Sequence, residues 1–144
     1  MSNIAIVGIG NPYRGDDGAG WEVIDRLKVD IPCIKSRGDI SELIDLFAQH
    51  ESLIFIDACP DLGVDWKRVD ALSVPINQRL TSTHGFGLSE AIAMAKQLQQ
   101  LPLCLILYLI NGTNFAMSQG LTHAVKESVQ QVVEEIEREC MNKV

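Results

Sequence analysis

Two aspartates and one histidine are the residues of this chain whose types and positions could support chemistry. Asp17 lies in a glycine-rich loop after the first apolar run, Asp57 lies at the end of a later apolar run, and His84 precedes a helical pattern. Carboxylate oxygens and an imidazole nitrogen form a mixed ligand set that suits a divalent first-row metal ion, and three protein ligands leave positions open for a substrate. The three residues predict a metal-assisted site if the fold brings them together.

Each of these residues also has a purely structural interpretation. Asp17, or its neighbour Asp16, could cap the N-terminus of the helix that follows. Asp57 could accept hydrogen bonds from loop amides, and His84 could be a hydrogen-bonded loop histidine. Such roles are common for any one residue, but the coincidence of all three at neighbouring strand ends favours a shared site.

Other catalytic classes have no signal in the sequence. The glycines Gly8 and Gly10 resemble the start of a dinucleotide-binding loop, but Tyr13 occupies the position of the third glycine and two adjacent carboxylates follow. There is no Walker loop, no G-x-S-x-G element and no H-E-x-x-H helix. Nucleotide binding and the serine, cysteine and ordinary zinc-protease mechanisms are therefore not supported.

The elements that must position these residues follow from the hydrophobic pattern. Short apolar runs predict buried strands, and apolar residues at three-and-four spacing predict helices. The segment 59–68 contains Pro60 and Gly63 and is too short for a parallel crossover, so the strand after it is expected to run antiparallel to its predecessor. Strands are predicted at 3–8, 31–36, 52–58, 69–74 and 103–110, and helices at 19–28, 40–49, 88–100 and 121–141.

This order of elements predicts an α/β fold. We expect a three-layer α/β/α sandwich with a five-stranded, mostly parallel mixed sheet in which one strand is antiparallel. A chain of 144 residues has room for one domain, here 1–144. Ligands of such sheets collect outside the carboxyl ends of the strands, which is where Asp17 and Asp57 are predicted to lie.

Composition and charge limit the partners. Twelve Lys and Arg residues against nineteen Asp and Glu give a formal net charge of -7, and no basic stripe suggests nucleic acid. No apolar run reaches the length of a membrane span and no signal peptide precedes the first strand, so we expect a cytoplasmic protein without membrane insertion. A monomer is expected, because no self-complementary apolar stripe is evident. The cysteines form no C-x-x-C pair and are expected to be reduced, buried thiols; they are Cys33, Cys59, Cys104 and Cys140.

A set of motifs extends over almost the whole chain. They are Gly8-Ile9-Gly10-Asn11, Gly15-Asp16-Asp17-Gly18-Ala19-Gly20, Ile56-Asp57-Ala58, His84-Gly85-Phe86-Gly87-Leu88 and Gly120-Leu121-Thr122. In their order and separations they resemble the hydrogenase maturation endopeptidases, a family that trims the C-terminus of the nickel-iron hydrogenase large subunit. The resemblance implies a five-stranded α/β/α fold and three residues that contact metal and carry out catalysis: Asp17, Asp57 and His84.

The resemblance also implies a substrate and a metal. The chain is expected to be a metal-dependent endopeptidase that removes the C-terminal extension of the large-subunit precursor after nickel insertion, with the nickel supplied by that precursor. Asp39 is a weaker candidate for a substrate-facing residue. Either an aspartate or a metal-bound water could drive hydrolysis. Two other functions stay open: a self-contained metal-dependent hydrolase of small peptides, and a metal-binding chaperone without chemistry.

Overall fold

The computed structural model describes residues 3–74 and 87–141, and its strands form one mixed sheet in the order β2-β1-β3-β5-β4. β1, β2, β3 and β5 are parallel to one another, whereas β4 pairs antiparallel with β5. The strands are β1 (Ile4–Ile9), β2 (Cys33–Ser36), β3 (Ser52–Cys59), β4 (Trp66–Asp70) and β5 (Cys104–Asn111). The helices are α1 (Ala19–Arg26), α2 (Ile40–Gln49), α3 (Leu88–Gln97) and α4 (His123–Met141), with short 3-10 turns at η1 (Gly15–Gly18) and η2 (Ala71–Ser73).

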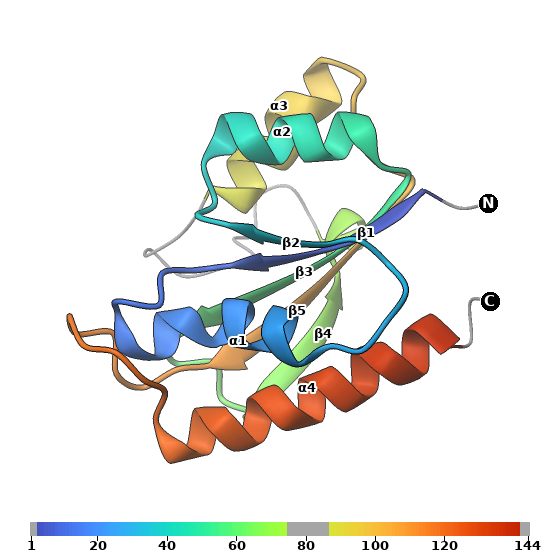
Figure 1. Cartoon of the computed structure of the whole chain (residues 1–144). Coiled ribbons are helices and arrows are strands. Elements are labelled where there is room, and N and C mark those ends of the chain that lie inside the picture. The colour runs from blue at the N-terminus through green and yellow to red at the C-terminus, as the bar shows by residue number, and fades with distance from the viewer. Residues whose placement is uncertain (1–2, 75–86, 142–144) are drawn as a thin grey trace.

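Two layers of helices cover the sheet, with α2 and α3 on one face and α1 and α4 on the other (Figure 1). The central strand β3 supplies both cores, because successive side chains of a strand point to opposite faces. Leu53 and Phe55 pack in the core under α2 and α3, while Ile54 and Ile56 pack in the core under α1 and α4. The predicted three-layer α/β/α sandwich with one antiparallel strand is confirmed.

The fourth strand differs in position from the prediction at 69–74. It spans Trp66–Asp70, and the residues that follow form the 3-10 turn η2. The start of this strand has no apolar run because it contains Lys67 and Arg68, and an edge strand can keep such polar side chains facing solvent. The direction of β4 is as predicted, but β5 rather than β3 is its neighbour in the sheet.

Two expectations about helix ends and thiols were also inexact. α1 ends at Arg26 and α3 at Gln97, two and three residues before the predicted ends. Cys59 and Cys140 are buried and Cys104 is half-buried, but Cys33 is exposed because it lies on the edge strand β2. All four thiols are free.

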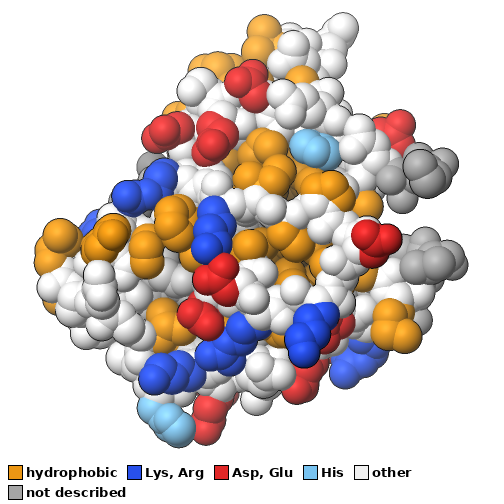
Figure 2. Space-filling model, in the orientation of Figure 1, with side chains coloured by type: hydrophobic (Ala, Val, Ile, Leu, Met, Phe, Trp, Pro, Cys, Tyr) orange, Lys and Arg blue, Asp and Glu red, His pale blue; other side chains and the backbone are white. Residues whose placement is uncertain are grey.

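The outer surface of α1 and α4 is polar and mixed in charge. Figure 2 shows acidic and basic side chains interspersed over the lower part of the molecule, where these helices lie. Arg26 pairs with Glu22 at 2.9 Å on α1, and Arg138 pairs with Glu135 on α4. In the described part of the chain, no helix is both long and apolar enough to cross a membrane.

Candidate functional site

Two glycines let the chain after β1 fold back onto the ends of the strands. A Cβ atom on Gly10 would lie 2.0 Å from the carbonyl oxygen of Asp17, and one on Gly20 would lie 2.7 Å from the carbonyl oxygen of Ile56. No other residue type fits such close backbone contacts. The glycine-rich loop thereby brings η1 to the carboxyl ends of β1 and β3.

Asp57 lies near the carboxyl end of β3, opposite Leu109 of β5. Its side chain is only 5% exposed, and strand alternation puts it on the same face as Phe55 and Cys59. Burial raises the pKa of Asp57 well above its usual range, and the negative charge of Asp17 raises it further. A hydrogen bond from the backbone of Ala58 opposes these effects without cancelling them.

Asp17 is half-buried and lies in η1. Its backbone amide donates to the carbonyl of Arg14 at 3.1 Å, and its carbonyl accepts from the amide of Asn11 at 3.2 Å. η1 packs against β3, and the negative charge of Asp17 acts on Asp57, so the two carboxyl groups lie near each other. Their oxygen atoms could ligate a metal ion at the edge of the sheet where α/β proteins bind ligands.

The third predicted ligand, His84, lies outside the described residues. Within residues 3–74 and 87–141, no group of three His, Cys, Asp or Glu side chains could hold a metal ion. Gly87, which begins the described chain after this gap, would with a Cβ approach within 3.0 Å of Ile40 Cδ1 at the start of α2. Asp39 precedes α2, is exposed, and makes no side-chain capping hydrogen bond.

Asp16 has a role that the sequence did not reveal. The alternative in which Asp16 or Asp17 caps the first helix is wrong, because both lie in η1 and Gly18 occupies the N-cap position of α1. Asp16 is fully buried and accepts hydrogen bonds from residues of the β5–α4 loop, 112–122. Burial by itself would raise the pKa of this carboxyl, but hydrogen bonds from Thr122 and the backbones of Thr113 and Asn114 outweigh burial and lower it. No local pattern links position 16 to a loop about a hundred residues away.

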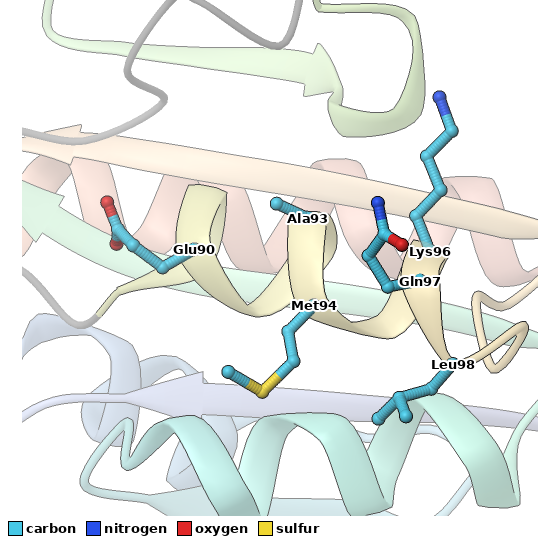
Figure 3. Close-up of a pocket in the computed structure, with 6 residues that line it drawn as sticks. All are labelled: Glu90, Ala93, Met94, Lys96, Gln97 and Leu98. Atoms are coloured by element: carbon cyan, nitrogen blue, oxygen red, sulfur yellow. The ribbon is translucent and has the colours of Figure 1, made fainter.

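A surface pocket elsewhere contains none of these acids. It lies along α3 and is lined by Glu90, Ala93, Met94, Lys96, Gln97 and Leu98 (Figure 3). All six residues come from one helix and its end, so the pocket is a shallow feature of the helix surface. The carboxyl edge of the sheet remains the candidate site.

Comparison with known proteins identifies the family. A family described as "Hydrogenase maturation protease" matches residues 38–139, which is more than two thirds of the chain. The chain belongs to the hydrogenase maturation protease family. The predicted family is thus confirmed, and with it the class of enzyme, an endopeptidase that hydrolyses peptide bonds. No curated protein is significantly similar in sequence.

Solved structures share the fold of this hydrogenase maturation protease. The hydrogenase maturating endopeptidase HybD from Escherichia coli has a TM-score of 0.79 at 18% identity, with 98% of this chain and 93% of that chain covered. The [NiFe] hydrogenase maturation protease HycI from Thermococcus kodakarensis has a TM-score of 0.69 at 22% identity, with coverages of 97% and 93%. A hydrogenase 2 maturation peptidase from a Thaumarchaeota archaeon has a TM-score of 0.63 at 24% identity, with coverages of 93% and 95%.

Proposed function

We propose that this protease is metal-dependent and removes the C-terminal extension of the nickel-iron hydrogenase large-subunit precursor after nickel insertion. In this proposal the nickel belongs to the substrate, and Asp17, Asp57 and His84 contact it. The observation that supports the proposal is the pair of neighbouring carboxyl groups of Asp17 and Asp57 at the carboxyl edge of the sheet. A cytoplasmic location and a monomeric state stay predictions from the sequence.

The environment of the two carboxyl groups favours a cation between them and the substrate. Asp57 is buried beside the negative charge of Asp17, and its carboxylate form is disfavoured first by burial and then by that charge. A divalent cation that arrives with the precursor would offset this repulsion, and oxygen ligands with one imidazole suit such an ion. Cleavage would then depend on whether the precursor carries its metal.

The chemistry assigned to the protein's own residues is proton transfer. A bound metal ion can polarise a carbonyl group or acidify a water molecule. Asp57 lies at the carboxyl edge of the sheet beside Asp17, so its carboxylate is placed to accept a proton from the attacking water. Such a general base contributes roughly two to four orders of magnitude in rate. Asp17 is the alternative base.

The test uses the precursor in two forms, with and without nickel, and measures the mass of the product. The wild-type protein is expected to shorten only the nickel-loaded form. His84→Ala is expected to leave that form uncut, because it removes the nitrogen ligand. His50→Ala is the matched control: His50 follows α2, where its ring contacts the carbonyl oxygen of Leu46 at 3.1 Å, and this variant should cleave as the wild type does.

Four outcomes would contradict the proposal. Equal cleavage of the nickel-free precursor would remove the dependence on nickel, and normal cleavage by His84→Ala would remove His84 from the site. Turnover of short peptides by protein that holds its own zinc would favour a self-contained hydrolase. A stable complex with the precursor and no shortened product would favour a chaperone.

A further inference from the structure

The carboxylate of Asp16 fills its hydrogen-bonding capacity with groups from one distant loop. Its Oδ2 accepts from the amides of Thr113 at 2.8 Å and Asn114 at 3.0 Å, and its Oδ1 accepts from the amide of Thr122 at 2.8 Å. The hydroxyls of Thr113 and Thr122 lie 3.3 Å and 3.1 Å from the same carboxylate. Asp16 therefore joins both ends of the β5–α4 loop to η1.

Backbone hydrogen bonds join the same two segments. The amide of Asp16 donates to the carbonyl of Asn114 at 2.8 Å, and the amide of Gly15 donates to the carbonyl of Ser118 at 2.7 Å. Gly15 has a φ of +56°, and a Cβ there would lie 2.4 Å from the carbonyl oxygen of Asn114, so the loop and η1 are in direct contact. The loop has no helix or strand of its own, and its conformation depends on these contacts.

Asp17 follows directly in the same short turn. η1 has no side-chain cap, and a 3-10 turn of four residues has little stability by itself. We infer that Asp16 is a positioning residue, which holds Asp17 beside Asp57 by anchoring η1 to the β5–α4 loop. The inference rests on the proposed function, in which Asp17 acts on the substrate.

The substitution Asp16→Asn tests hydrogen bonding separately from side-chain shape. The two side chains have nearly the same size, but an amide has one acceptor oxygen and one NH2 donor. In Asp16→Asn the NH2 group would face either the amides of Thr113 and Asn114 or that of Thr122, and donors would oppose donors. The variant should loosen η1 without leaving a cavity.

Glu139→Gln provides a matched control far along α4. Glu139 is a carboxylate that joins three elements, since it accepts from Arg68 at 2.9 and 3.1 Å and from Tyr108 at 2.6 Å. Like Asp16→Asn, the Glu139→Gln substitution replaces an acid with an amide, but at a position away from Asp17. The kcat and KM for nickel-loaded precursor are measured at a temperature at which circular dichroism shows both variants folded.

We expect Asp16→Asn to lower kcat by about 10- to 100-fold with KM changed less than about threefold. Residues that orient the catalytic residues without touching the substrate have effects of this size. Glu139→Gln should leave both constants within about threefold of the wild type. Wild-type kcat for Asp16→Asn, or an equal loss in both variants, would overturn the inference. Should Asp16→Asn not fold, Thr122→Val, which removes one hydroxyl donor, should lower kcat by roughly two- to fivefold.

Amide hydrogen exchange on the free protein gives a readout that needs no substrate. In Asp16→Asn, exchange at Asp17 and in the 113–122 loop should be about tenfold faster or more, while the amides of α4 keep their rates. Unchanged exchange at Asp17 would overturn the inference even if cleavage fell, and faster exchange with normal kcat would overturn it as well. If the wild type cleaves no precursor at all, the proposed function fails, and the exchange rates alone decide whether Asp16 fixes Asp17.

Discussion

Two buried aspartates of this protease stand in opposite environments. Asp16, fully buried, meets amides and hydroxyls of the β5–α4 loop, and its pKa is lowered. Asp57 is 5% exposed and lies near the charge of Asp17. Burial and this charge raise its pKa, and the hydrogen bond from the backbone of Ala58 only partly opposes them. The two side chains lie on segments that pack against each other, η1 and β3.

This contrast shows that burial alone does not decide what an aspartate does. A buried carboxylate that is surrounded by donors is stable as an anion and serves the structure. A buried carboxyl group with few donors and a negative neighbour carries an energetic cost in its charged form, and such groups cluster at functional sites. Asp16 fits the first description and Asp57 the second.

The largest expected effect is the loss of cleavage in Asp57→Asn. The rate of processing of nickel-loaded precursor should fall by roughly 10²- to 10⁴-fold, the range for loss of a general base. The free energy of unfolding should stay within about 1 kcal/mol of the wild type, because within residues 3–74 and 87–141 the hydrogen bond to this carboxyl group comes from the backbone of Ala58. Single-turnover cleavage and urea denaturation measure the two quantities. Cleavage within threefold of normal would place Asp57 outside the chemistry.

The second effect is on stability. Asp16→Asn should lower the free energy of unfolding by roughly 2–4 kcal/mol, because it leaves buried donors of the β5–α4 loop without acceptors. Urea denaturation with an unchanged m-value would measure this loss. A loss below about 0.5 kcal/mol would mean that these hydrogen bonds contribute little and that the two aspartates do not differ as described.

The third effect is on the pH dependence of stability, and the two residues should act with opposite sign. Asp57 has a raised pKa in the folded state, so the folded protein binds a proton at this carboxyl group more tightly than the unfolded chain does. The stabilisation from this proton is lost as pH rises from the ordinary pKa of 3.8 through the raised pKa. Asp16 has a lowered pKa, so its stabilisation is present above 3.8 and is lost as pH falls through the lowered pKa.

Denaturation midpoints measured from about pH 2.5 to about pH 7 test this contrast. Asp57→Asn should weaken the fall in stability on the alkaline side, and Asp16→Asn should weaken the fall on the acidic side. The same pH profile in both variants would show that the contrast is wrong.

The smallest effect is expected at the Tyr108–Glu139–Arg68 cluster, a third hydrogen-bonded carboxylate. Tyr108 is fully buried and its hydroxyl donates to Glu139 at 2.6 Å. Tyr108→Phe removes one hydrogen bond and leaves the two from Arg68, so the free energy of unfolding should fall by about 1–2 kcal/mol. Thermal denaturation and the cleavage assay measure the result. Slower cleavage would extend the functional region to the far part of β5.

Hydrophobic periodicity and motifs were enough to predict the order of the elements and the family. Periodicity identified α2 at residues 40–49 and the buried strands β1, β3 and β5, because the burial of a whole strand or helix face leaves a local pattern. It also predicted Asp57 at a strand end, because an acid at the end of an apolar run breaks that pattern. The role of His84 is still a prediction from the motifs.

Other features depend on contacts that form only in the folded chain. The edge strand at Trp66–Asp70 is defined by its hydrogen-bonded ladder with β5, and its polar residues give it no clear hydrophobic pattern. The contact of Asp16 with Thr113 and Thr122 joins positions far apart in the chain. The raised pKa of Asp57 likewise depends on burial by the surrounding fold and on the charge of the distant Asp17. Composition and spacing report what a residue's neighbours in sequence require, whereas hydrogen bonding and protonation depend on neighbours in space.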